Sequence, residues 1–289
     1  MDNPLNKRRV AVGLIGSGIQ YSSSPAVHME EGAALGLNYT YELFDLDLIS
    51  GGTAALPGVL AEAEQRGFAG VNVTYPCKQS VVPLLHELSP EAEMLQSVNT
   101  VVFRDGRRFG HNSDWWGFAE SFRRGLPGVS LQNVALIGAG GAGSATGFAA
   151  LRMGAPRLTI FDTNAARARE LAERMVRLFP DRQVVAAATL DEALAGATGL
   201  IHATPMGMQK LPGLPVPASL LQPDMWVAEI VYVPLETQLL QVAKRRGCRT
   251  LAGNGMTVYQ AAMSFELFCG VKPDTTRMMG RFTSKLATS

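Results

Sequence analysis

Two charged residues in polar surroundings could do acid–base chemistry. Lys78 follows a run in which strand alternation would put Asn72 and Thr74 on the same face. We expect Lys78 to open a helix, where the helix dipole and partial burial would both favour loss of its proton and make it a usable acid or base near neutral pH. Asp114 would fix that ammonium if the two side chains meet. The simpler alternatives are a surface lysine and a helix N-cap.

A glycine-rich turn gives a second chemical signal. The strand-like segment Val134–Ile137 runs directly into Gly138-Ala139-Gly140-Gly141-Ala142-Gly143, which fits the pattern G-x-G-x-x-G. Gly138 allows a tight turn, Gly140 lets the backbone approach a pyrophosphate, and Gly143 allows the following helix to pack closely on the strand. The N-terminus of that helix attracts phosphate charge. The pattern predicts a dinucleotide site; the alternative is a glycine turn that only packs a sheet.

Asp162 indicates which dinucleotide binds. It ends the next predicted strand, Arg157–Phe161, where a carboxylate can accept hydrogen bonds from the adenosine ribose hydroxyls. A ribose 2′-phosphate would be repelled by that charge, so NAD is favoured over NADP. Arg167 and Arg169 could reach such a phosphate, but we expect them on the solvated face of the next helix.

No pattern indicates a metal site or a disulfide framework. Cys77, Cys248 and Cys269 are too few and too scattered for either. His111 and His202 have no partner at a recognisable spacing, so we interpret both as buried histidines whose hydrogen bonds are satisfied inside the protein.

The elements that must position these residues alternate between short β-rich runs and helical patterns, which is typical of an α/β fold. We predict an α/β domain at residues 1–118, joined by returning helices at 256–289, and a Rossmann dinucleotide-binding domain at 119–255, with a cleft between the domains. The predicted strands and helices are Val10–Ile15, Ala26–Leu35, Tyr39–Phe44, Gly70–Thr74, Lys78–Leu88, Val134–Ile137, Arg157–Phe161, Arg167–Phe179, Gly199–His202, Trp226–Ile230, Arg249–Leu251 and Met256–Cys269.

Composition limits the partners. The 289 residues include 26 Lys and Arg against 25 Asp and Glu, and a net charge of +1 provides no field that would attract nucleic acid or an anionic membrane. The long charge-free stretch between Arg124 and Arg152 contains Pro127 and the glycine cluster, so we do not expect a membrane helix. The N-terminus has no signal-peptide pattern. We expect a cytoplasmic protein, monomeric or homodimeric, that binds a small molecule.

Taken together, eight motifs resemble the shikimate/quinate dehydrogenase family, in the family's order and across nearly the whole chain. Besides the glycine-rich loop, they are Ser22-Ser23-Ser24-Pro25, Asn72–Lys78, Ser97-Val98-Asn99-Thr100, Asn112-Ser113-Asp114, Ala203–Met208, Val231-Tyr232-Val233-Pro234 with Thr237, and Gly255-Met256 with Gln260.

The resemblance implies that the first domain is a substrate-binding α/β domain, followed by the Rossmann domain and a returning C-terminal helix, and it implies a role for each matching position. Lys78 and Asp114 would be the catalytic pair that moves the proton of the reacting hydroxyl while a hydride passes between the substrate ring and NAD. The substrate would be held by Ser22, Ser24, Thr74, Asn99, Ser113, Tyr232 and Gln260. The cofactor would be held by Gly138, Gly140, Gly141, Ala142, Gly143 and Asp162, with Thr204, Ile230 and Gly253 beside the nicotinamide half.

Several positions depart from the family pattern. Ser113 replaces a usual threonine and leaves room for bulk such as the extra ring hydroxyl of quinate. His202 stands where the family usually has Asn, and Glu229 where it usually has Asp. Shikimate and quinate both remain open as substrates. The alternatives are an amino-shikimate or other secondary-metabolism dehydrogenase on the same scaffold, and a non-catalytic ligand or redox sensor, although a sensor would have no need of the Lys78–Asp114 pair.

Overall fold

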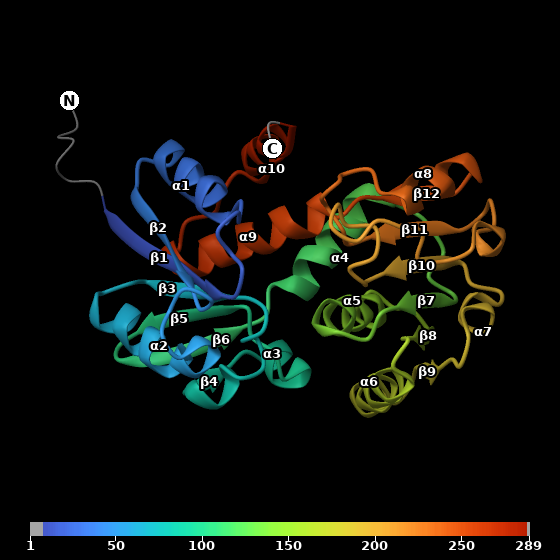
Figure 1. Cartoon of the computed structure of the whole chain (residues 1–289), viewed down its shortest axis with the longest axis horizontal. Coiled ribbons are helices and arrows are strands. Elements are labelled where there is room, and N and C mark those ends of the chain that lie inside the picture. The colour runs from blue at the N-terminus through green and yellow to red at the C-terminus, as the bar shows by residue number, and fades with distance from the viewer. Residues whose placement is uncertain (1–7, 288–289) are drawn as a thin grey trace. The chain divides into compact units, whose positions relative to one another are not determined.

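The computed structural model describes residues 8–287, and the chain divides into two compact units (Figure 1). Unit 1 contains residues 8–113 and 260–287, and unit 2 contains residues 114–259. The chain leaves unit 1 just before helix α4 (Asp114–Gly125) and re-enters it within helix α9 (Asn254–Cys269). Each unit has a six-stranded sheet of its own, which confirms the α/β class.

Unit 1 is built on a mixed sheet. Its elements, besides part of α9, are β1 (Arg9–Gly16), α1 (Ser24–Ala34), β2 (Asn38–Asp45), η2 (Gly52–Ala55), α2 (Leu56–Gln65), β3 (Gly70–Val73), η3 (Val82–Leu84), β4 (Glu87–Leu88), α3 (Pro90–Leu95), β5 (Thr100–Arg104), β6 (Arg107–His111) and α10 (Thr275–Ala287). The strand order is β2-β1-β3-β5-β6-β4, with β1, β2 and β3 parallel and β5 antiparallel to both neighbours. The three strands predicted here are confirmed as β1, β2 and β3, within one residue at each end.

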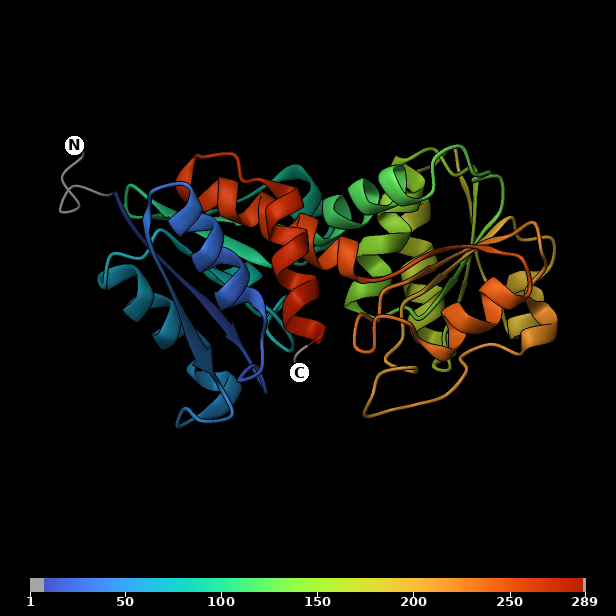
Figure 2. The ribbon, with the colours of Figure 1, turned by 90° about the horizontal axis from the view of Figure 1, so that it is seen from above.

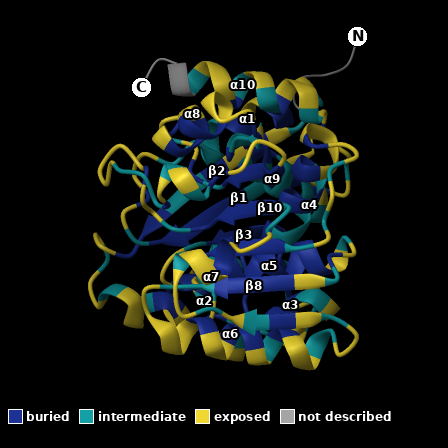
Figure 3. Cartoon of the chain, turned by 90° about the vertical axis from the view of Figure 1, so that its right-hand side faces the viewer, coloured by how far each residue is buried: buried dark blue, intermediate teal, exposed yellow. Residues whose placement is uncertain are grey.

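Both faces of this sheet are covered because side chains alternate along each strand. Val12 and Leu14 of β1 belong to a buried cluster with Phe265 of α9. Ile15, on the opposite face, belongs to a second cluster with Leu60 of α2. The central strands are accordingly dark blue in Figure 3.

The helix predicted at residues 78–88 is wrong. This segment consists of turns, the 3₁₀ turn η3 and the two-residue strand β4. The carbonyl of Lys78 accepts a 2.8 Å hydrogen bond from the N–H of Val98 instead of supporting a helix, and Pro83 has no N–H to give to one. Lys78 therefore does not lie at the start of a helix, and the predicted effect of a helix dipole on it is wrong.

Helices α1 and α10 lie side by side in unit 1 (Figure 2). The carboxylate of Glu31, which is buried, accepts two hydrogen bonds of 2.7 Å from the guanidinium of Arg277 and one from the N–H of Asp274. This charge-assisted contact fixes the end of the described chain against the first helix of the unit.

Unit 2 has a fully parallel sheet with helices on its faces. Besides α4 and the start of α9, its elements are β7 (Val134–Ile137), α5 (Gly141–Arg152), β8 (Arg157–Phe161), α6 (Ala165–Leu178), β9 (Gln183–Ala186), α7 (Leu190–Leu194), β10 (Gly199–His202), η4 (Ala218–Leu220), β11 (Trp226–Glu229), α8 (Gln238–Arg245) and β12 (Arg249–Leu251). The strand order β12-β11-β10-β7-β8-β9 is that of a Rossmann domain. The order reverses between β7 and β10, so dinucleotides bind at the carboxyl ends of these two strands in this fold.

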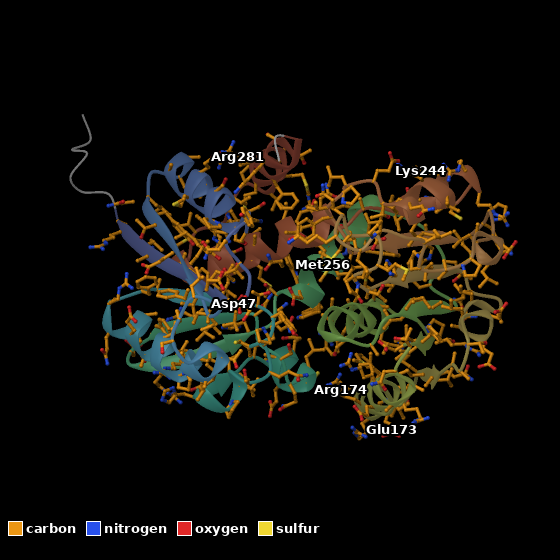
Figure 4. All side chains as sticks on the ribbon, viewed as in Figure 1. Asp47, Glu173, Arg174, Lys244, Met256 and Arg281 are labelled. Atoms are coloured by element: carbon orange, nitrogen blue, oxygen red, sulfur yellow. The ribbon has the colours of Figure 1, made fainter. Side chains whose placement is uncertain are left out.

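Helix α6 illustrates how the sequence pattern becomes structure. Its buried side chains include Leu171 and Met175, whereas Glu173 lies on the exposed face (Figure 4). Asn164 caps the helix by accepting from the N–H groups of Ala166 and Arg167. The predicted amphipathic helix is thus confirmed.

The helices of the described chain are short. Among residues 8–287 the longest is α9, with 16 residues. No helix in that range is long and apolar enough to cross a membrane.

Candidate active site

Three of the residues predicted to bind substrate lie together in unit 1. The backbone N–H of Ser113 donates to Oδ1 of Asn99 at 2.8 Å, and Nδ2 of Asn99 donates to Oγ of Ser113 at 2.9 Å. The same hydroxyl lies 3.4 Å from Oε1 of Gln260 on α9. Asn99 and Ser113 are almost fully buried, so these polar groups hold one another in fixed orientations.

Asn72 supports this cluster from strand β3. Its Nδ2 donates to the carbonyl of Asn99, and its Oδ1 accepts from the hydroxyl of Tyr41 at 2.9 Å. Burial raises the pKa of Tyr41, and a hydrogen bond with the Ser24 side chain partly offsets that effect. Tyr41 therefore joins Ser24 to the Asn99 cluster, a role that strand alternation alone did not reveal.

The loop before α1 is organised by Asp45, another residue that the sequence analysis missed. The Asp45 carboxylate accepts from the N–H groups of Gly18 and Ile19 and from the side-chain amide of Gln20. Although burial raises the pKa of Asp45, the hydrogen bonds from Gln20 and from nearby backbone N–H groups outweigh burial and lower it. The carboxylate at the end of β2 thus holds the turn that leads to Ser22.

Lys78 and Asp114 flank the Asn99–Ser113 pair along the chain. Lys78 is half-buried, and its carbonyl is bonded to Val98, the residue before Asn99. Asp114 is buried and follows Ser113 directly, at the first position of α4. The two residues fall on opposite sides of the division between the units, and their pairing stays a prediction.

Thr74 lies just beyond β3. Its backbone N–H donates to the carbonyl of Ile15 at 2.9 Å, and its side chain is half-buried. The side chain contacts the residue at the end of β1, because a Cβ added to Gly16 would lie 2.4 Å from Cγ2 of Thr74. Thr74 is therefore held beside the turn that Asp45 organises.

The glycine-rich loop of unit 2 has the geometry that a dinucleotide requires. Gly138 has a φ of 105°, which favours glycine, and a Cβ on Gly143 would lie 1.9 Å from the Gly138 carbonyl oxygen. A Cβ on Gly140 or Gly141 would meet nothing within 4 Å. Gly140 precedes α5, and no side chain caps this helix. The exposed N–H groups and open space fit a pyrophosphate.

Asp162 lies where the sequence analysis expects the ribose contact. It follows β8, and its Oδ2 accepts a 2.7 Å hydrogen bond from the N–H of Ala139 in the glycine-rich loop. Its Oδ1 accepts from the N–H of Asn164 at 2.8 Å. The carboxylate is half-buried, so part of it remains available to a ligand.

The three residues predicted beside the nicotinamide all lie at the carboxyl edge of the same sheet. Thr204 follows β10, and its Cγ2 would lie 2.9 Å from a Cβ placed on Gly138. A Cβ on Gly253 would lie 2.3 Å from the carbonyl oxygen of Ile230. Tyr232, in the loop after β11, is 39% exposed. The structure thus brings Thr204 to Gly138, and Ile230 to Gly253.

Two family profiles match the chain. One, described as the shikimate dehydrogenase substrate binding domain, matches residues 14–101. The other, described as the alanine dehydrogenase/PNT C-terminal domain, matches residues 122–222. The first match lies within unit 1 and the second within unit 2.

Individual proteins are similar over almost the full chain. A shikimate dehydrogenase (NADP(+)) of Streptomyces avermitilis is 51% identical over 93% of this chain and 93% of its own. A quinate/shikimate dehydrogenase (NAD(+)) of Corynebacterium efficiens is 41% identical over 97% of this chain and 100% of its own. The solved structure of quinate dehydrogenase from Corynebacterium glutamicum in complex with NAD is similar, with a TM-score of 0.91 and 39% identity, and the match covers 96% of this chain and 100% of that one.

Proposed function

Because the chain belongs to the shikimate/quinate dehydrogenase family, we propose that it is an NAD-dependent oxidoreductase that oxidises the ring hydroxyl of shikimate, quinate or both. The products are 3-dehydroshikimate and 3-dehydroquinate. The observation that carries this proposal is the buried Asn99–Ser113 pair, which is bonded to Gln260 and flanked along the chain by Lys78 and Asp114. No observation favours the amino-shikimate dehydrogenase or the sensor.

We propose that the substrate is held by Ser22, Ser24, Thr74, Asn99, Ser113, Tyr232 and Gln260. Hydroxyl and amide groups of this kind can pair with each ring hydroxyl and with the carboxylate of the substrate. The hydrogen bonds that already fix Asn99 and Ser113 support this assignment, since they orient polar groups before a ligand arrives.

Lys78 and Asp114 are proposed as the acid–base pair. When the substrate is oxidised, the ring carbon loses a hydride, its hydroxyl proton passes to the Lys78 amine, and a C=O bond forms. Asp114 would orient the lysine. The bonded chain Lys78–Val98–Asn99–Ser113–Asp114 supports their proximity, because each step is either a covalent bond or a hydrogen bond of 2.9 Å or less.

The dinucleotide supplies the hydride acceptor when bound, and unit 2 would hold it. We assign its pyrophosphate to Gly138, Gly140, Gly141, Ala142 and Gly143, its ribose to Asp162, and its nicotinamide half to Thr204, Ile230 and Gly253. NAD is favoured over NADP because the Asp162 carboxylate would repel a 2′-phosphate. The predicted domains, 1–118 with 256–289 and 119–255, would then be the substrate and NAD domains.

We also propose that the protein works in the cytoplasm as a monomer or homodimer. Cys77, Cys248 and Cys269 are free and buried, which suits a reducing compartment. Light scattering coupled to size-exclusion chromatography would give the mass in solution, and a trimer or larger assembly would contradict the proposed state.

The decisive experiment measures initial rates with shikimate and with quinate, each against NAD and NADP. We expect reduction of NAD with at least one of the acids, at a higher kcat/KM than with NADP. Absence of reduced coenzyme in all four combinations, from folded protein, would overturn the proposed activity. A preference for NADP would overturn only the assignment of the coenzyme.

A further inference from the structure

Two ionisable side chains that the proposed mechanism does not use lie buried against each other in unit 2. His202 ends β10, Glu229 ends the neighbouring strand β11, and neither side chain is exposed. Nδ1 of His202 lies 2.8 Å from Oε1 of Glu229, and Nε2 lies 2.5 Å from Oγ1 of Thr204. The imidazole therefore links a buried carboxylate to the threonine that follows β10.

The partners of Glu229 determine which nitrogen of the imidazole carries the proton. Oε1 of Glu229 also accepts from the N–H of Val231 at 2.9 Å, and Oε2 accepts from the hydroxyl of Thr237 at 3.1 Å. An ionised carboxylate can only accept hydrogen bonds, so we assign a proton to Nδ1 of His202, which donates to Glu229. In the neutral ring Nε2 is then an acceptor, and the Thr204 hydroxyl donates to it.

This arrangement fixes the Thr204 hydroxyl in two directions. Its proton is directed at His202, and its oxygen also accepts from the N–H of Met206 at 3.2 Å. The same network holds helix α8, because the Thr237 hydroxyl caps it by accepting from the N–H of Leu240. His202 thus ties the loop after β10 to the loop after β11 and to the start of α8.

The linked residues lie where the strand order of the sheet reverses. Strands β7 and β10 are neighbours, and the first glycine of the dinucleotide loop packs against the segment that His202 holds. A Cβ on Gly138 would lie 2.7 Å from the carbonyl oxygen of Ala203 and 2.9 Å from Cγ2 of Thr204. A shift of Thr204 would therefore change its packing against Gly138 of the dinucleotide loop.

An asparagine at position 202 would match only the near half of the imidazole, including the place of Nδ1, and would end short of Thr204. The hydrogen bond to Thr204 therefore depends on Nε2, the far ring nitrogen of His202.

We propose that His202 is a positioning residue for the coenzyme: held by Glu229, it fixes Thr204 in the orientation that the nicotinamide half of the dinucleotide needs. Stability alone gives a weaker account of the pair, because replacing both partners of a buried hydrogen bond by well-packed apolar groups often costs little stability. This inference rests on the proposed function, since it assigns a partner to Thr204 in the same coenzyme site.

The test measures the dissociation constant of NAD without substrate, by isothermal titration calorimetry, in variants that remove one half of the link at a time. His202→Asn keeps an amide at the place of Nδ1 and loses the contact with Thr204; His202→Gln extends an amide to the place of Nε2. Thr204→Val removes the hydroxyl and keeps the shape, and Thr204→Ser keeps the hydroxyl. We expect His202→Asn and Thr204→Val to weaken NAD binding about three- to tenfold, as the loss of one hydrogen bond predicts.

The double variant His202→Asn/Thr204→Val should bind NAD no more weakly than either single variant, because each change breaks the same link. His202→Gln and Thr204→Ser should bind more tightly than His202→Asn and Thr204→Val, respectively. If His202 had only a structural role, its variants would lower the melting temperature without producing this order of NAD affinities. Should the histidine variants fail to fold, the threonine pair still tests the role of the hydroxyl.

A matched control is His28→Gln, since His28 is the other buried histidine bonded to a hydroxyl, at 3.1 Å from Tyr39, and lies in unit 1. It should leave the dissociation constant of NAD unchanged. NAD binding within measurement error of wild type in both His202→Asn and Thr204→Val would overturn the inference. Wild-type protein that binds NAD but oxidises neither acid would instead overturn the proposed reaction, and the binding test would still stand.

Discussion

The carboxylate of Asp162 accepts a 2.7 Å hydrogen bond from the backbone N–H of Ala139, the second residue of the glycine-rich loop. The residue proposed to hold the ribose therefore also fixes the loop proposed to hold the pyrophosphate. Holding the ribose and fixing the loop both depend on an acceptor oxygen. Excluding a 2′-phosphate depends instead on the negative charge of the carboxylate.

Replacing Asp162 by asparagine separates the role of the acceptor oxygen from the role of the negative charge. The amide oxygen of Asp162→Asn can still accept from Ala139, while the repulsion of a phosphate is removed. We expect kcat/KM with NADP to rise about tenfold relative to kcat/KM with NAD. Steady-state rates with both coenzymes provide the measurement, and an unchanged ratio would mean that Asp162 does not select the coenzyme.

Lys78 is the residue on which the chemical step should depend most. Lys78→Ala should lower kcat by about 10² to 10⁴-fold, because a positioned acid or base contributes about that factor. Circular dichroism should show an unchanged fold. Lys244→Ala is the control, since Lys244 lies on the exposed face of α8 (Figure 4) and pairs there with Glu236, and its rate should match wild type. A kcat close to wild type in Lys78→Ala would remove the lysine from the mechanism.

The parallel sheet of unit 2 could be predicted well because its signals are local. Strands such as Val134–Ile137 and Gly199–His202 are short apolar runs bounded by turn residues, and the structure has them with the predicted ends. The helix prediction for the segment after Lys78 failed because part of what determines its conformation is not local. The carbonyl of Lys78 is bonded to Val98, twenty residues away, which no local pattern contains, although Pro83 was a local signal against a helix.

Part of what was missed could have been found in the sequence. Strands β5 and β6 form an antiparallel pair around Asp105-Gly106, and Asp-Gly between strand-like runs is a strong hairpin signal. The roles of Tyr41, Asp45 and Glu229 could not be found in this way. Each depends on a partner brought close only by the fold, as Tyr41 is to Asn72 and Glu229 is to His202.

Ser113 should influence the choice between the two acids. Its side chain is fully buried and bonded to Asn99, so an added methyl group must take space from its surroundings. Ser113→Thr keeps the hydroxyl and should lower kcat/KM for quinate relative to shikimate by about ten- to two-hundredfold, the usual effect of one methylene-sized change. Ser113→Ala should instead weaken catalysis with both acids. Equal effects of Ser113→Thr on the two substrates would contradict the proposed role.

His28 should make the stability of the protein depend on pH. Burial among aromatic side chains, including Tyr41 and Phe265, lowers its pKa from 6.5 to about 3. Between these values the unfolded chain binds a proton at His28 and the folded chain does not, so the free energy of unfolding falls as the pH is lowered through this window. Its contribution to the slope should reach about 1.4 kcal/mol per pH unit.

His28→Gln has no group that titrates at this position and should remove that contribution. Urea unfolding of wild type and variant, at neutral pH and at several values between 6.5 and about 3, measures the difference in slope. The carboxylates titrate in both proteins, so their effects cancel in the comparison. Parallel loss of stability in the two proteins on acidification would show that His28 can take up its proton without unfolding, against the burial that the structure gives it.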